Sequence, residues 1–78
     1  MANPGPAPQR LATELSHQDV ELLKLLAGGL SLDSVGRRMG TSERTVRRRV
    51  KAVCDRLGVG TSIQAVAWAA RRGLVLLV

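Results

Sequence analysis

The sequence predicts an all-α domain of four short helices, and two observations support this fold class. Hydrophobic residues make up 45% of the 78 residues, but there is no Phe, no Tyr and one Trp, so the core must be aliphatic. Four segments with the apolar periodicity of helices follow one another, and a glycine comes after each of them. A chain of this length has room for one domain.

The first ten residues are expected to lie outside that domain. Pro4, Pro6 and Pro8 alternate there with small residues, and proline removes a backbone donor and disfavours a helix interior. We therefore interpret residues 1–10 as a disordered leader or linker stub, and residues 11–78 as the folded domain.

The first two helices are predicted from capping residues. Ser16, with Asp19 three residues later, forms a capping-box pattern that starts a helix from about His17 to Ala27. Ser31 caps a second and shorter helix from Leu32 to Met39, which the next glycine ends.

The third helix is predicted to begin near Thr41 or Ser42 and to run from about Glu43 to Leu57. Its four aliphatic residues fall within one narrow arc at about 100° per residue; they are Val46, Val50, Val53 and Leu57. This arc must be buried. The opposite side is almost entirely cationic, with Arg44, Arg48, Lys51 and Asp55 on it, Arg47 on one flank, and Arg49 and Arg56 on the other.

The charge of the chain is concentrated in this region. The formal net charge is +6, and eight of the twelve Lys and Arg residues lie between Arg37 and Arg56, against two acids, Glu43 and Asp55. Such a clustered cationic field favours association with a polyanion.

The second and third helices together form the pattern of a helix-turn-helix. Val35, Met39 and Val46 are spaced to pack across the turn, and Gly36 leaves room for a close helix crossing. In this motif the first helix braces the second, which enters the major groove of DNA. Arginine can read guanine there with two parallel hydrogen bonds. The sequence therefore predicts binding to double-stranded DNA through the third helix.

A longer pattern supports the same interpretation. The pattern can be followed along the chain in the right order, without insertions or deletions. Its matching residues are Leu15 and Ser16, Glu21 to Leu23, Leu25 to Ala27, Gly29 to Ser31, Val35, Arg38 to Gly40, Ser42 to Arg47, Val50, Leu57 to Val59, and Ala65 to Ala67. Through them the chain resembles the LuxR-type (GerE-like or NarL-like) DNA-binding domain, the output module of many bacterial response regulators and quorum-sensing regulators. The resemblance implies a four-helix helix-turn-helix bundle without a wing.

The resemblance also implies site residues. Arg47, Arg48 and Lys51 are expected to reach bases, while Thr45 and neighbouring cations are expected to approach phosphates. The full set of expected DNA-binding residues is Ser42, Arg44, Thr45, Arg47, Arg48, Arg49 and Lys51.

The fourth helix is predicted from Ile63 to Arg72, after a second capping box of Thr61 with Gln64. Its expected core arc is Ile63, Val66, Ala67 and Ala70, which leaves Ala65, Trp68, Ala69 and Arg72 pointing outward. This helix often mediates dimerisation in the family that the chain resembles, so the expected homodimer contacts are Gln64, Ala65, Trp68 and Arg72. For Trp68, folding back onto the core or the tail is the alternative. The apolar tail, residues 74–78, is expected to cover the first helix.

Other functions receive less support. One cysteine, Cys54, and one histidine, His17, provide neither a disulfide nor an ordinary zinc site, and no cofactor is expected. With no clustered carboxylates, we expect no enzyme. Two alternatives remain: a domain like region 4 of a sigma factor, with RNA polymerase as a further partner, and a cationic binder of membrane surfaces. No apolar run is long enough for a membrane span, and the chain is expected to be cytoplasmic.

Overall fold

The computed structural model describes residues 15–76, and this part of the chain contains four helices and no strand. The helices are α2 (His17–Ala27), α3 (Leu32–Met39), α4 (Glu43–Leu57) and α5 (Ser62–Arg71). The predicted all-α class is confirmed, and every helix lies within one residue of its predicted bounds. The predicted leader, residues 1–10, lies outside the described residues.

Each helix begins at a residue whose side chain satisfies the first free backbone amides. The hydroxyl oxygen of the cap accepts a hydrogen bond from the amide three residues later, at Ser16, Ser31, Ser42 and Thr61. Both predicted capping boxes are present, since the side chains of Asp19 and Gln64 accept in return from the cap amides. Caps of this kind stabilise a helix by about 1 kcal/mol each.

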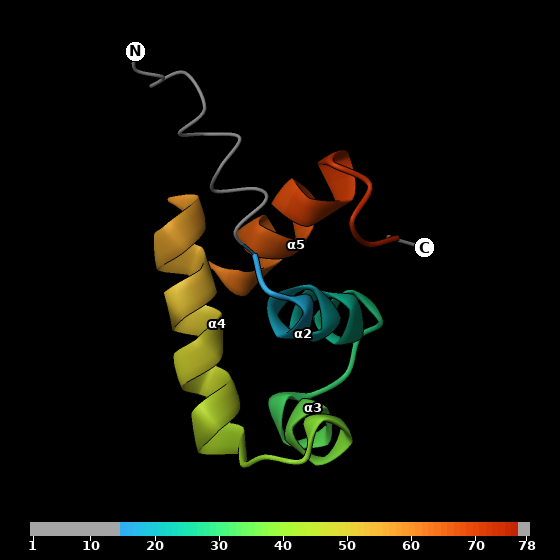
Figure 1. The fold of residues 1–78 in the computed structure, drawn as a ribbon, viewed down its shortest axis with the longest axis vertical. Coiled ribbons are helices and arrows are strands. Elements are labelled where there is room, and N and C mark those ends of the chain that lie inside the picture. Colours follow the sequence, from blue (N-terminus) through green and yellow to red (C-terminus); the bar gives the residue numbers. More distant parts are fainter. Residues whose placement is uncertain (1–14, 77–78) are drawn as a thin grey trace.

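Helix α4 lies along one side of the molecule, and α2, α3 and α5 gather on its other side (Figure 1). It packs against all three of them. The largest fully buried side chains come from α2, α3 and α4: Leu22, Leu23, Val35, Val46 and Val53. The core is aliphatic, as the composition predicts.

Gly36 allows the turn between α3 and α4 to pass close to α3. A Cβ atom at this position would lie 2.9 Å from the carbonyl oxygen of Thr41 and 3.1 Å from the carbonyl carbon of Ser42. The amide of Thr41 donates a hydrogen bond to the carbonyl of Gly36 at 2.8 Å. The glycine therefore makes room for the backbone of the turn itself, and this fixes where α4 begins.

The far end of α4 is tied to the start of α2. The carboxylate of Asp19 accepts hydrogen bonds from the backbone amide of Ser16 at 3.1 Å and from Nη1 of Arg56 at 3.0 Å. The side chain of Asp19 is 16% exposed, so solvent screens this contact less than it screens the other ion pairs of the described residues.

The predicted orientation of α5 is wrong in part: Val66 is buried and Arg72 is exposed, as expected, but other residues differ. Ala65 and Ala69, expected to point outward, are 1% and 0% exposed and belong to the core cluster, whereas Ile63, expected in the core, is 79% exposed. Helix α5 packs against α2 and α4 through small side chains that allow a close approach. The larger Ile63, in the first turn of α5, lies outside this contact.

Trp68 and the tail both pack onto the core. Trp68 is partly buried against the core cluster, and the guanidinium carbon of Arg72 lies 4.0 Å from the centroid of its ring. Val75 belongs to the same cluster as Leu22 and Leu23 of α2, in agreement with the expected covering role of the tail. Residues 77–78 of the predicted tail lie outside the described residues.

We expect Gly36→Ala to lower the free energy of unfolding by about 1–3 kcal/mol, because the new methyl group overlaps backbone atoms that cannot rotate away. Denaturant unfolding followed by circular dichroism measures this. Gly28→Ala is the matched control, since the nearest atom to its Cβ lies at 3.4 Å and its φ is −78°. A loss as large in the control would contradict the explanation.

We expect Asp19→Ala to lower the free energy of unfolding by about 1–2 kcal/mol, because the change removes half of the capping box and the contact with Arg56. Glu21→Ala removes an exposed carboxylate of the same helix and should change stability by less than about 0.5 kcal/mol. Equal effects of the two substitutions in thermal or chemical unfolding would show that the Asp19 contacts contribute nothing.

Candidate nucleic-acid interface

The two faces of α4 are separated as the sequence predicts. Val46 and Val53 are buried, and Val50 and Leu57 pack against the core. On the opposite side the cations are in contact with solvent: Arg44, Arg47, Arg48 and Lys51 are exposed and Arg49 is partly exposed. We name these five residues the cationic face of α4. Burying the valine side of the helix presents the cationic face to solvent.

The hydroxyl groups at the start of α4 have structural partners. The Ser42 oxygen accepts from the amide of Thr45 at 3.1 Å, and the Ser42 hydroxyl donates to the Thr45 hydroxyl oxygen at 3.1 Å. In the described part of the chain, Thr45 Oγ1 has no hydrogen-bond partner besides the Ser42 hydroxyl. Ser42 therefore serves α4 as its cap, and the Thr45 hydroxyl has the greater hydrogen-bonding capacity left for a ligand.

Ion pairs divide the cationic face into two groups. Arg47 Nη2 lies 2.6 Å from Glu43 Oε2, and Lys51 Nζ lies 3.6 Å from Asp55 Oδ2. Among residues 15–76, Arg44, Arg48 and Arg49 form no ion pair. Exposed ion pairs of this kind contribute about 1 kcal/mol or less to stability. All five cations can therefore still bind an external anion.

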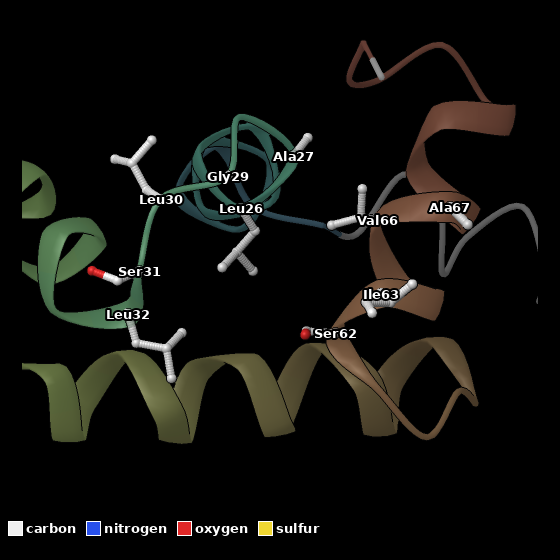
Figure 2. A pocket seen from close by; sticks show the side chains of 10 residues that line it. All are labelled: Leu26, Ala27, Gly29, Leu30, Ser31, Leu32, Ser62, Ile63, Val66 and Ala67. Atoms are coloured by element: carbon white, nitrogen blue, oxygen red, sulfur yellow. The ribbon is translucent and has the colours of Figure 1, made fainter. Parts of the chain in front are cut away.

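An apolar groove lies on a different part of the molecule. It is open to solvent, has a volume of about 520 Å³ and is lined by the end of α2, the loop that leads into α3, and the start of α5. Figure 2 shows Leu26, Leu32 and Ile63 around it, from three different segments. Its lining contains no charged side chain.

The sequence pattern did not predict that Ile63 is exposed, although one signal could have indicated it. Ile63 comes directly after the first residue of α5, where a helix has completed no full turn and few neighbours can cover it. The pairing of Glu43 with Arg47 was also missed, although their spacing of four residues, with the acid first, is the favourable arrangement on a helix.

Cys54 is buried and is not one of the residues of the cationic face. Burial raises the pKa of its thiol, with a further increase from Asp55 that Lys51 opposes. In the described part of the chain, no three His, Cys, Asp or Glu side chains are placed to hold a metal ion. No helix between residues 15 and 76 is both long and apolar enough to cross a membrane.

Comparison with known proteins agrees with this geometry. Residues 13–69 match the model of the luxR family of bacterial regulatory proteins. The transcriptional regulatory protein YdfI of Bacillus subtilis (strain 168) is 34% identical over 67 residues, which cover 86% of this chain and 32% of that protein. The chain therefore spans about a third of this relative's length. It belongs to the luxR family of bacterial regulatory proteins, which are DNA-binding regulators of transcription and not enzymes.

Proposed function

We propose that this chain reads double-stranded DNA for a transcriptional regulator, with α4 as the recognition helix in the major groove. The observation that carries the proposal is the cationic face of α4, which is exposed along the helix while the valine side is buried. The major groove admits one helix, and phosphates attract cations without regard to sequence.

The residues of α4 would divide the contacts according to their position. Arg47, Arg48 and Lys51 lie in the middle turns of α4, with Arg48 and Lys51 opposite the core and Arg47 on one flank, and these three would face base edges in the groove. Arg44, in the first turn, and Arg49, on the other flank, would reach phosphates, which fixes the register of the protein on the duplex.

The start of α4 would approach a phosphate directly. Its free amides and the helix dipole favour an anion, and Thr45 has a hydroxyl proton to donate. Ser42 would act through its cap rather than by touching DNA, since its hydroxyl already joins the amide and side chain of Thr45.

The alternative of a membrane-surface binder receives no support from α4. A helix that lies in a bilayer interface needs an exposed apolar face, and Val46 and Val53 are buried in the core. The cationic face alone would adhere to anionic lipid far less specifically than to a groove of matching width.

We further propose that two copies associate on DNA through α5 and the apolar groove. The exposed Ile63 of one copy would pack against the groove of the other, whose lining carries no charge. Two copies with a net charge of +6 each repel one another in solution, and bound DNA relieves that repulsion. Association should therefore depend on DNA.

The burial of each side chain changes which residues we propose for this dimer contact. Ala65 is excluded because it is buried within its own chain. Gln64 and Arg72 are exposed and stay in the proposal, as does the partly buried Trp68, whose ring carries Arg72. Ile63 joins them, because large exposed apolar residues mark contact surfaces.

We expect Arg48→Ala to weaken binding to a preferred duplex by about 1–3 kcal/mol and to relax the base preference at one position. The preferred duplex is enriched from a random pool with the unmodified chain, and affinity is then measured by anisotropy of a labelled duplex as salt is raised. A plot of the logarithm of the association constant against the logarithm of the salt concentration should have a slope of about −0.9 per neutralised phosphate.

Arg71→Ala is the matched control, since it removes the same charge from an exposed site on α5. A similar loss for both variants would mean that net charge alone drives binding. Absence of duplex binding by the unmodified chain in low salt would refute the proposed function.

For the dimer, we expect Ile63→Ser to weaken binding to a duplex with two half-sites more than to one with a single half-site, because only the longer duplex holds two copies. Leu76→Ser is the control, since Leu76 is 84% exposed but does not line the groove. Equal losses on both duplexes would exclude Ile63 from the contact between copies. Trp68→Ala, tested in the same way, needs a parallel measurement of stability because its ring packs on the core.

A further inference from the structure

We propose that Glu43 is a positioning residue that determines specificity: its carboxylate holds the guanidinium of Arg47 for base reading and weakens the attraction of Arg47 to phosphates. This inference rests on the proposed role of α4 in the major groove. Glu43 acts through Arg47 and need not touch DNA itself.

The geometry distinguishes this pair from the other pair on α4. Arg47 Nη2 lies 2.6 Å from Glu43 Oε2, a short charge-assisted hydrogen bond, whereas Lys51 Nζ and Asp55 Oδ2 are 3.6 Å apart, beyond hydrogen-bond length. Glu43 is also the less exposed partner, with 42% of its side chain accessible against 64% for Arg47, and it lies in the first turn of α4, where the helix dipole favours a carboxylate.

The pairing is compatible with reading a base. An arginine side chain has five N–H donors in one plane, and a guanine accepts two of them. The bond to Glu43 uses one of the remaining three. Because this bond fixes one end of the guanidinium, fewer conformations are lost when the other edge meets a base.

The same carboxylate also opposes binding of Arg47 to the phosphate backbone of DNA. Phosphates attract a guanidinium on any sequence, and the negative charge of Glu43 beside Arg47 opposes that attraction. Arg44 and Arg48 have no such partner among the described residues. The cationic face of α4 thus combines cations suited to phosphates with one arginine that a carboxylate reserves for a base edge.

The experiment compares Glu43→Gln with Asp55→Asn. Each replaces a carboxylate by an amide on α4 and raises the net charge by one, so both should increase affinity for any duplex. Affinities are measured at one salt concentration for the duplex enriched by the unmodified chain and for the same duplex with its base order scrambled. The readout is the ratio of the two affinities.

We expect Glu43→Gln to lower this ratio about fivefold or more, the lower end of what one bidentate arginine contact discriminates. Asp55→Asn should leave the ratio within about twofold. In an Arg47→Ala background, Glu43→Gln should no longer change the ratio, because the side chain that it positions is gone. Circular dichroism of each variant checks that the fold is retained.

An unchanged ratio for Glu43→Gln, or the same decrease for both amide variants, would overturn the inference and leave the proposed function intact. A persistent decrease in the Arg47→Ala background would also overturn it, since Glu43 would then act without Arg47. If the unmodified chain enriched no sequence and bound no duplex, the proposed function would fail and the inference with it.

Discussion

The burial of one side of α4 is the constraint on which the rest of this structure depends. Val46 and Val53 lie within the aliphatic core formed with α2, α3 and α5. Because a helix is rigid and its side chains are spaced at about 100°, burying this side leaves no freedom for the other. The cationic face is therefore presented to solvent as a consequence of core packing.

Both ends of α4 are then fixed by contacts outside its own core side. At its start, Gly36 lets the preceding turn pass close to α3, and Ser42 caps the helix. Near its end, Arg56 meets the carboxylate that also caps α2. A recognition element needs such support, because a small displacement of the backbone moves a long arginine side chain by more than a hydrogen bond tolerates.

The molecule separates two kinds of surface. The cationic face repels a second copy but attracts a polyanion, whereas the groove beside Ile63 carries no charge and favours apolar contact. This separation is consistent with the proposed order of events, in which each copy binds DNA before the two copies meet. Carboxylates also distinguish the cations of this face from one another. Glu43 pairs with Arg47, whereas Arg48 forms no ion pair with any of the described residues.

The sequence by itself determined what depends on near neighbours in the chain. Capping residues and glycines predicted the bounds of the helices, and the valine spacing of α4 predicted its exposed face. The DNA-binding residues expected on that face remain a prediction, which only binding measurements can test. Tertiary structure decided the orientation of α5, because close approach to α2 and α4 favours the smallest side chains, Ala65 and Ala69, whereas a pattern of apolar residues favours the larger Ile63. It also decided the contact between Asp19 and Arg56, since residues 37 positions apart meet only after the chain has folded.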